Sequence, residues 1–558
     1  MRPRAERGQD PGVYGGISNP ERQLSMRRSW LMVLLVMPAL AGGWILRDLA
    51  PVNGAKLFAS VLQHVQDHAL DGISEDSAYE AAARGLLTQI HDPYADLWSP
   101  EELARYSREE LRGSYGGLGM LIQDQNGAIT VTQVFPHSPA QNGGVLAGDR
   151  IVLVNGQRVT GLRIDSVSAR LLGPIGTKVE VTFARSGVGE PIRGTFERAS
   201  VRQPAVPYAI VLDGGVGYLP LQRFSDSAAE EVFDAVRKLQ ADGASSLVLD
   251  MRGNGGGSLE DALQISDFFL QTGQKLATVK YRGRADDVYA DRRAAVVDRW
   301  PVVVLVDQYS ASATEIVAGA LQDHDRGVVL GTTTFGKGLV QEIYRLDDGW
   351  AMKLTVGKWF TPSGRTIQRE RDDNGIEKDT LPLAERPKFQ SDAGRTVYGG
   401  GGITPDLNVV QDTVSTQEFQ LLRSLGARST QLYVAVFEEA RELKGTVQPG
   451  FQVPQAWRDV VYQKINSDST PVSRAEFDAA RPLVDRLLKQ RVTSLAFGDS
   501  AAYRVIAGED APVRTALELL GRAHTQKDLF ALVDQQKGSS ARGQAPGTTA
   551  RAEKQGTK

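Results

Sequence analysis

The sequence predicts an α/β core that follows a small β-rich module, with helical regions before and after them. From about residue 214 to 360, short apolar strands alternate with helical stretches, which is typical of a buried and largely parallel sheet. Residues 113–200 instead show short alternating strands and glycine turns, which indicate an independent β module. A chain of 558 residues is also too long for one ordinary domain.

The composition supports a folded chain and excludes several kinds of site. Apolar residues make up 41% of the chain and charged residues 23%, which is enough for globular cores. The net charge of -3 offers no basic face for nucleic acid. The chain has no cysteine, so a thiol nucleophile, disulfides and thiolate metal sites are excluded.

The pattern at the amino terminus predicts an export signal. Residues 30–46 are uncharged and mostly apolar, and Arg22, Arg27 and Arg28 precede them. This charge pattern predicts that residues 1–29 stay in the cytoplasm and that the chain beyond residue 47 is exported. The run is short for a membrane span, and 39–41 (Ala-Leu-Ala) resembles a cleavage site. A retained signal-anchor and a cleaved signal peptide both fit; we expect the anchor, with Met26 as an alternative start.

The remaining segments follow from periodicity. Apolar residues at helical intervals, such as Leu57, Val61 and Val65, predict a helical region over 48–112. In the core, the expected strands and helices are 217–221, 226–240, 247–250, 259–271, 302–307, 313–324 and 328–331. Residues 369–394 are polar and predict a surface excursion; 413–536 are helical, and 537–558 have the composition of a disordered tail.

Ser312 is the candidate nucleophile. It lies between the strand 302–307 and the helix 313–324, where a strand-to-helix turn can expose a hydroxyl near the positive end of the helix dipole. The backbone N–H of Ala313 would then face an oxyanion. Taken alone, helix capping by Ser310 or Ser312 is the simpler interpretation.

Lys337 is the candidate general base. It stands between Gly336 and Gly338 beside an apolar strand, and burial there would favour its neutral form. A neutral lysine can activate a serine hydroxyl. Gln341 could orient the amine without adding charge. A phosphate-binding loop is excluded because its Gly-x4-Gly-Lys-Ser/Thr pattern is absent: Gly338 and then Leu339, and not Ser or Thr, follow Lys337.

A glycine-rich loop at 253–257 ends another core strand. Its backbone N–H groups, above all those of Gly255 and Gly256, could supply the second oxyanion donor; a nucleotide-binding loop is the alternative. Of the six histidines, only His324 lies in the core, and the helix places it about 18 Å from Ser312. No metal-binding cluster is apparent, so neither a metal nor another cofactor is expected.

These elements occur in the order found in the carboxyl-terminal-processing (tail-specific) serine proteases, which residues 55–410 resemble. The matching segments are 92–94 (Asp-Pro-Tyr), 115–120 (Tyr-Gly-Gly-Leu-Gly-Met), 138–140, 148–151, 155–156, 250–257, 310–315, 335–338, 361–364 and 402–406. Three features depart from the family pattern. Gly255 replaces a proline, Leu172 replaces a basic residue, and the extension 413–536 is longer than usual.

The resemblance implies a PDZ domain over 113–200, inserted into or preceding a serine peptidase core over 201–412 with crotonase- or Clp-protease-like βα units. It implies that Ser312 is the nucleophile, Lys337 the base and Gln341 the residue that positions it. Ala313 with Gly255 or Gly256 would form the oxyanion hole. The PDZ loop would bind a substrate's terminal carboxylate through four residues, namely Gly117, Leu118, Gly119 and Met120.

The expected function is therefore a serine endopeptidase that recognises the free C-terminal tails of proteins or peptides. We expect it on the cytoplasmic membrane with its catalytic part outside the cytoplasm (periplasmic or extracellular), or secreted if the signal is cleaved. No nucleic-acid partner is expected, and the helical ends are candidate surfaces for a homodimer. The alternatives are an inactive PDZ scaffold and a crotonase-like acyl-transfer enzyme.

Overall fold

The computed structural model describes residues 52–107, 114–125, 128–135, 138–185, 188–371, 378, 381–411, 415–426, 429–466 and 472–543. The chain divides into two compact units, Met1–Ile90 and His91–Lys558. The predicted signal segment 30–46 and its flanking arginines lie outside the described residues. Among the described helices, none is both long and apolar enough to cross a membrane.

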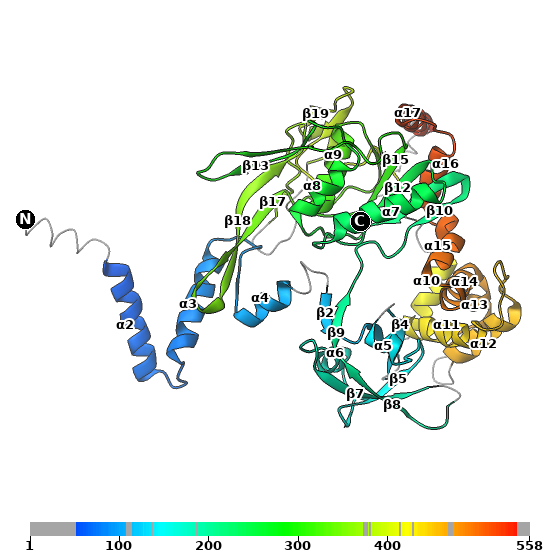
Figure 1. Ribbon diagram of the computed structural model, residues 1–558, viewed down its shortest axis with the longest axis horizontal. Helices are drawn as coiled ribbons and strands as arrows, with labels where there is room; N and C mark the ends of the chain where they lie inside the picture. Colours follow the sequence, from blue (N-terminus) through cyan, green and yellow to red (C-terminus); the bar gives the residue numbers. More distant parts are fainter. Residues whose placement is uncertain are drawn as a thin grey trace, which may run out of the picture. The chain divides into compact units, whose positions relative to one another are not determined.

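The first unit contributes two described helices, α2 (Val52–His68) and α3 (Glu75–Gln89) (Figure 1). The hydroxyl of Ser74 caps α3 by accepting a hydrogen bond from the N–H of Ser77 at 3.2 Å. Both helices lie in the region predicted to be helical. That region also contains a strand in the second unit, β1 (Asp96–Trp98), which the periodicity did not predict.

The β-rich module begins and ends on paired strands. Strand β2 (Ser114–Gly117) pairs antiparallel with β9 (Ala199–Arg202), so the chain enters and leaves the module side by side. Its main sheet has the order β3-β4-β5-β7-β8, with β6 paired to β5. These elements are β3 (Met120–Gln125), β4 (Ala128–Val134), α5 (Pro139–Asn142), β5 (Arg150–Val154), β6 (Gln157–Arg158), α6 (Ile164–Leu171), β7 (Lys178–Ala184) and β8 (Ile192–Glu197). Strand β3 therefore forms one edge of this sheet.

The core contains the predicted parallel sheet, with the order β10-β11-β12-β15-β16-β21. All neighbouring strands are parallel except β10 and β11. The strands are β10 (Ile210–Leu212), β11 (Val216–Pro220), β12 (Ser246–Asp250), β15 (Val302–Val306), β16 (Val328–Gly331) and β21 (Leu407–Asn408). Every residue of β11, β12 and β15 is buried, as their uninterrupted apolar runs predict.

The two faces of this sheet have separate covers because successive strand residues point in opposite directions. Val302 and Val304 pack in the cluster with three helices, α7 (Ala228–Ala241), α8 (Leu259–Asp267) and α9 (Ala313–Asp323). Val303 and Leu305 pack instead with helices of the C-terminal extension. Helix α8 ends at Asp267, so it is shorter than the helix predicted over 259–271.

The loop that contains Lys337 leads into a second, antiparallel sheet. Its order is β1-β18-β13-β14, with β17 paired to β18. The strands are β13 (Lys275–Tyr281), β14 (Asp287–Ala290), β17 (Leu339–Arg345) and β18 (Ala351–Phe360), and the short helix α4 (Pro100–Tyr106) follows β1. Because β1 precedes the β-rich module and pairs with β18, the module is inserted into the core. The excursion predicted over 369–394 contains β19 (Lys388–Gln390), which pairs with β20 (Thr396–Tyr398).

The C-terminal extension, coloured yellow to red in Figure 1, has two roles. Helices α10 to α14 build their own apolar cluster, whereas α16 and α17 supply the second cover of the core sheet. The helices are α10 (Thr416–Leu425), α11 (Ser429–Leu443), α12 (Gln455–Ile465), α13 (Arg474–Ala479), α14 (Arg481–Phe497), α15 (Asp499–Ile506), α16 (Ala511–Leu520) and α17 (Gln526–Gly543). Helix α17 thus continues past residue 537, where the sequence predicts a disordered tail; residues 544–558 lie outside the described chain.

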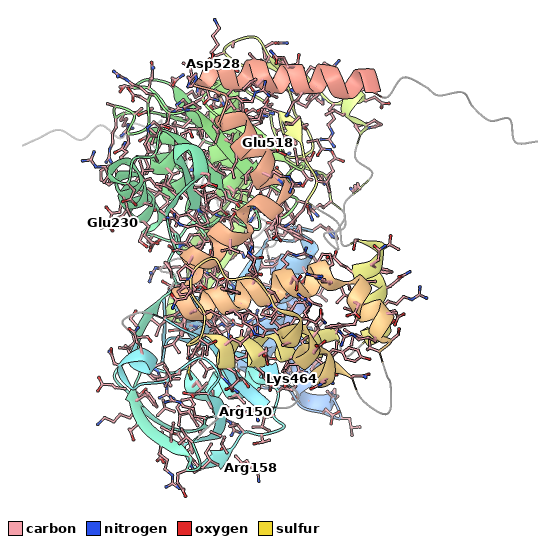
Figure 2. All side chains as sticks on the ribbon, turned by 90° about the vertical axis from the view of Figure 1, so that its right-hand side faces the viewer. Arg150, Arg158, Glu230, Lys464, Glu518 and Asp528 are labelled. Atoms are coloured by element: carbon pink, nitrogen blue, oxygen red, sulfur yellow. The ribbon has the colours of Figure 1, made fainter. Side chains whose placement is uncertain are left out.

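The extension also contacts the β-rich module. Arg150 on β5 pairs with Glu438 on α11 at 3.3 Å, and Lys464 on α12 approaches the same carboxylate at 3.6 Å; Figure 2 labels Arg150 and Lys464. A second contact joins the Gln133 amide to the carboxylate of Asp499 at 3.0 Å. The module is therefore held from the side of the extension as well as by its own strands β2 and β9.

Candidate active site

Ser312 stands at the start of α9 in a backbone conformation that few side chains adopt. Its φ is 57°, in the left-handed region, which costs a non-glycine residue free energy and is typical of functional turns. The N–H of Glu315 is bonded to the carbonyl oxygen of Ser312 at 2.9 Å, as expected for a first helical turn. In the described chain, the N–H of Ala313 has no hydrogen-bond acceptor, so it is available to a ligand.

The turn before Ser312 is fixed by buried polar contacts. The hydroxyl of the fully buried Ser310 donates to the carbonyl oxygen of Met251, at the end of the neighbouring strand β12, at 2.9 Å. The Asp307 carboxylate accepts the N–H of Ser310 at 3.0 Å. Ser310 therefore ties the turn to the neighbouring loop, which is more than the capping role considered from the sequence.

The glycine-rich loop lies directly against Ser312. The fully buried Asn254 donates from its amide to the carbonyl oxygen of Leu221 at 2.8 Å and accepts the N–H of Gly256 at 2.9 Å. Gly256 has a φ of 97°, and a Cβ added there would lie 2.9 Å from both the nitrogen of Ala313 and the Cβ of Ser312. Only glycine fits at this position.

These contacts distinguish the predicted oxyanion donors. The N–H of Gly256 is already bonded to Asn254. The N–H of Gly255 has no acceptor among the described residues, and neither has that of Ala313. Of the three predicted donors, Ala313 and Gly255 therefore have free N–H groups, and Gly256 does not.

Lys337 lies two residues before the start of β17, and its surroundings favour the neutral amine. Burial lowers the pKa of Lys337, the positive charge of Lys353 lowers it further, and the charges of Glu315 and Asp92 act in the opposite direction. The Nζ atom lies 4.7 Å from the centroid of the Tyr94 ring. A lysine in this place loses its proton more readily than one in water.

Glu315 joins the serine turn to the lysine loop. It is fully buried, and its carboxylate accepts the backbone N–H groups of Ser312 at 2.8 Å, Gly336 at 2.8 Å and Lys337 at 2.9 Å, together with the hydroxyl of Thr334. Burial raises the pKa of Glu315, and these hydrogen bonds oppose the rise. The residue was not singled out from the sequence, although an acid in the first turn of a mostly apolar helix was the signal available.

Gln341 lies on β17, opposite Thr355 of β18. Its amide donates to the hydroxyl of Thr355 at 3.3 Å, and the N–H of Thr355 donates to the carboxylate of Asp92 at 3.0 Å. Between the described residues, no hydrogen bond joins Lys337 to either Gln341 or the hydroxyl of Ser312. The Asp-Pro-Tyr segment thus holds the strand pair that carries Gln341 and places its tyrosine ring over the lysine.

The predicted residues nevertheless meet in one cavity of about 600 Å³. Its lining includes all six candidates for chemistry, namely Ser312, Lys337, Gln341, Ala313, Gly255 and Gly256. His324 lies at the other end of α9 and binds Asp392 at 2.7 Å. Within the described parts of the chain, no group of three or more His, Asp or Glu side chains is placed to hold a metal ion.

A second cavity, of about 510 Å³, lies between strand β3 and helix α6 of the β-rich module. Leu118, Gly119 and Met120 line it, with Ile164 and Leu171 from the helix. The N–H groups of Leu118 and Gly119 have no acceptor within the described structure, so they are free to bind an anion. Gly117, the fourth predicted residue, does not line the cavity and pairs with Ala199 in the β2–β9 ladder.

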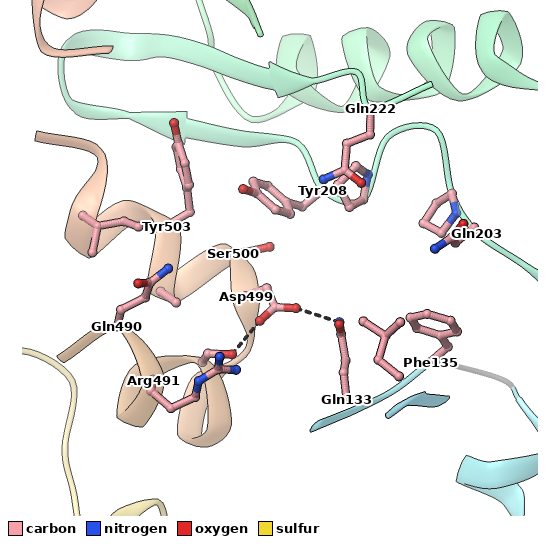
Figure 3. A pocket seen from close by; sticks show the side chains of 16 residues that line it. Gln133, Phe135, Gln203, Tyr208, Gln222, Gln490, Arg491, Asp499, Ser500 and Tyr503 are labelled. Atoms are coloured by element: carbon pink, nitrogen blue, oxygen red, sulfur yellow. Dashed lines mark hydrogen bonds between the residues drawn. The ribbon is translucent and has the colours of Figure 1, made fainter. Parts of the chain in front are cut away.

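A third cavity, of about 690 Å³, lies where the module, the linker to the core and the extension meet (Figure 3). Asp499 lines this cavity and accepts hydrogen bonds from Gln133 at 3.0 Å and from Ser494 at 2.6 Å. None of the predicted site residues lines it. Gln222 does, and this residue also lines the catalytic cavity.

The end of β12 carries a further polar cluster that sequence reasoning missed. Arg252 binds Asp250 at 2.6 Å and reaches Asp510, the residue that caps α16, at 3.0 Å. The Asp250 carboxylate also accepts the hydroxyl of Tyr218 at 2.7 Å. This cluster connects the strand end beside the glycine loop to the C-terminal extension.

Two family models match the chain. The model of peptidase family S41 matches residues 215–381, and a PDZ domain model matches residues 130–185. The S41 match contains Ser312 and Lys337, and the PDZ match lies within the β-rich module.

Curated relatives agree with these matches. The chain is 31% identical over 352 residues to the carboxy-terminal processing protease CtpA of Bacillus subtilis, covering 63% of this chain and 72% of that protein. It is 34% identical over 341 residues to a carboxy-terminal-processing protease of Bartonella bacilliformis, covering 59% of this chain and 76% of that protein. A solved structure of a photosystem II D1 C-terminal processing protease shares 28% identity, covering 66% of this chain and 90% of that one, with a TM-score of 0.35.

Proposed function

The chain is a serine-type peptidase of family S41 and belongs to the carboxy-terminal processing proteases, and we propose that it cleaves protein tails with Ser312 as nucleophile and Lys337 as base. The observation that carries this proposal is the shared cavity. It brings Ser312, Lys337 and two unbonded backbone N–H groups together around one space.

The proposed reaction is acyl transfer in two halves. The neutral amine of Lys337 takes the proton of the Ser312 hydroxyl while its oxygen attacks the scissile carbonyl carbon. The N–H groups of Ala313 and Gly255 stabilise the resulting oxyanion. Lys337 then gives its proton to the leaving amine, and the acyl-enzyme forms as the peptide bond breaks. A water molecule, deprotonated by Lys337, releases the acyl group and regenerates Ser312.

Gln341 enters this scheme as a positioning residue. Its side chain lines the cavity and is held by Thr355. A small turn of the side chain would allow its amide oxygen to accept a hydrogen bond from Lys337, because catalytic hydrogen bonds often tighten only when substrate is bound. An amide in this role orients the amine without adding a negative charge that would raise its pKa.

The PDZ cavity supplies the substrate class. The free N–H groups of Leu118 and Gly119 would bind the terminal carboxylate, and the apolar side chains of Met120, Ile164 and Leu171 would hold an apolar last residue. The peptide would lie along the edge strand β3, where it can continue the sheet. We therefore propose protein or peptide substrates with free and apolar C-terminal tails.

The remaining expectations are also proposals. The βα units of the core would have a crotonase- or Clp-protease-like arrangement. The apolar run 30–46 would act as a membrane anchor that leaves the peptidase outside the cytoplasm, and the helical ends would form a homodimer. Intact mass of the membrane-bound protein tests whether the run is retained, and light scattering of the solubilised protein tests the dimer.

The catalytic proposal is tested with the full chain and a peptide that ends in an apolar residue. Ser312→Ala and Lys337→Ala should each abolish cleavage and leave the melting temperature within a few degrees of the parent. Ser245→Ala and Lys358→Ala, at exposed positions outside the cavity, should retain full activity. Turnover in either cavity variant would refute the Ser–Lys assignment, and an inactive parent would favour the scaffold alternative.

A further inference from the structure

Arg223 lines both the PDZ cavity and the catalytic cavity. It lies in the segment that follows β11, and both of its neighbours are fixed. The N–H of Gln222 donates to Ala205 at 2.9 Å, and the N–H of Phe224 donates to the carbonyl oxygen of Gly256 at 3.2 Å. The backbone of Arg223 is therefore anchored to the glycine loop beside Ser312, at the border of the two cavities.

The guanidinium group of Arg223 has no partner among the described residues. The side chain is partly exposed, and it makes no hydrogen bond or ion pair with the described residues. Arg252, by contrast, binds Asp250 and Asp510. A guanidinium that faces a cavity with its donors free is suited to bind a carboxylate through two parallel hydrogen bonds.

The charge of the catalytic cavity points the same way. Besides the neutral base Lys337, its lining contains two cationic side chains, those of Arg223 and Lys353, and none of the described side chains that line it is acidic. In the PDZ cavity the acid is Asp165, which is exposed and already pairs with Arg163 at 3.1 Å. Positive potential in a walled cavity attracts anionic groups of a substrate.

The order of the two cavities tells which part of a substrate passes Arg223. In the proposed function, the substrate's terminus lies in the PDZ cavity and its scissile bond lies at Ser312. The segment that connects them must then pass the border where Arg223 stands. We infer that Arg223 is a specificity-determining residue that binds a carboxylate in the substrate segment between the scissile bond and the C-terminus. This inference rests on the proposed function.

The carboxylate has two sources, an Asp or Glu side chain in that segment or the terminal carboxylate itself. Two peptide series separate them. In the first, one Asp is moved through the positions between the scissile bond and an apolar last residue, and each peptide has an Asn twin. In the second, the same peptides carry a free or an amidated C-terminus.

The full-length protein should cleave the best Asp peptide about tenfold faster in kcat/KM than its Asn twin, as one charged hydrogen-bonded pair at a partly exposed site allows. Arg223→Gln should bring this ratio close to one, and Arg223→Glu should invert it. If Arg223 binds the terminal carboxylate instead, Arg223→Gln should reduce the ratio between free and amidated peptides. The matched control is Arg158→Gln, on an exposed arginine of β6 that Figure 2 labels.

A binding measurement keeps this test separate from that of the proposed function. In a Ser312→Ala background, the Kd ratios of the same peptide pairs should fall with Arg223→Gln and persist with Arg158→Gln. If the parent cleaves nothing, the proposed function fails and these ratios still decide the inference. The inference is wrong if both ratios survive Arg223→Gln, or if they are lost with Lys353→Met and kept with Arg223→Gln.

Discussion

The carboxylate of Glu315, in the first turn of helix α9, accepts the backbone N–H of Lys337, in the loop before β17, at 2.9 Å. Its other oxygen and its remaining lone pairs bind Gly336, Thr334 and the N–H of Ser312. One buried acid thus sets the distance between the backbone of the nucleophile and that of the base. The turn at Ser312 and the loop at Lys337 cannot move apart without leaving this carboxylate unpaired in the interior.

We expect Glu315→Gln to impair both folding and catalysis. The amide keeps one acceptor oxygen but turns an NH₂ group toward N–H donors, which leaves buried groups unpaired and costs about 2 kcal/mol. Urea unfolding and kcat measure the two effects. The control is Glu260→Gln, at an exposed position in the first turn of α8, and a Glu315→Gln variant as stable and active as this control would contradict the assignment.

The pH dependence of activity should report the environment of Lys337. The base must be neutral, so kcat/KM should rise with pH through the pKa of Lys337, which burial and Lys353 hold below the value of a free lysine. Lys353→Met removes a neighbouring positive charge. The pKa of Lys337 should therefore rise, and the ascending limb of the profile should shift to higher pH.

The control for this shift is Lys358→Met, on the same strand β18 but exposed and absent from the cavity lining. Its profile should match that of the parent. An ascending limb that does not move in Lys353→Met would show that another group controls the profile.

Gly256→Ala should block the oxyanion site. The added Cβ would lie 2.9 Å from the nitrogen of Ala313 and 2.6 Å from the carbonyl oxygen of Ala311. Loss of access to a single oxyanion donor costs about 10²-fold or more in kcat. Labelling of Ser312 by a serine-directed acylating probe should slow to the same degree.

Gly273→Ala is the control for the effect of backbone strain alone. Gly273 has a similar φ of 92°, but nothing lies within 4 Å of an added Cβ. This variant should lose about 1 kcal/mol of stability and retain its labelling rate. Equal labelling of the two variants would exclude a steric effect at the site.

The Arg252–Asp510 pair should hold α16 to the core. Asp510→Ala removes both an ion-pair partner and the cap that accepts the N–H of Val513, and we expect a loss of about 1–2 kcal/mol. Hydrogen exchange of α16 should become faster than that of α7, on the opposite face. Glu518→Gln, at an exposed position of α16 that Figure 2 labels, should change neither.

Much of the core could be predicted from local pattern. The apolar runs that became β11, β12, β15 and β16 each match the period and length of buried strands, and the helices between them follow. Ser312 and Lys337 could be selected because glycines and small residues flank them near strand ends, where a side chain can stand clear of the backbone. The family resemblance then ordered these elements.

The missing parts depend on contacts between distant residues. Strand β1 reads as part of a helical region, yet its pairing with β18 overrides that preference. No local pattern predicts the ion pair between Arg252 and Asp510. None predicts that the N–H of Gly256 is bonded to Asn254 while that of Gly255 is free. The proposed role of Arg223 could not be predicted from the sequence, because it depends on the position of the residue between two cavities.

The cover that α16 and α17 place on the core sheet has a consequence for biosynthesis. These helices leave the ribosome after all six strands that they protect, so a nascent core exposes the apolar residues of that sheet face until they arrive. The catalytic residues are synthesised long before the sheet beneath them is sealed. Proteolytic competence should therefore appear only after these C-terminal helices have been synthesised.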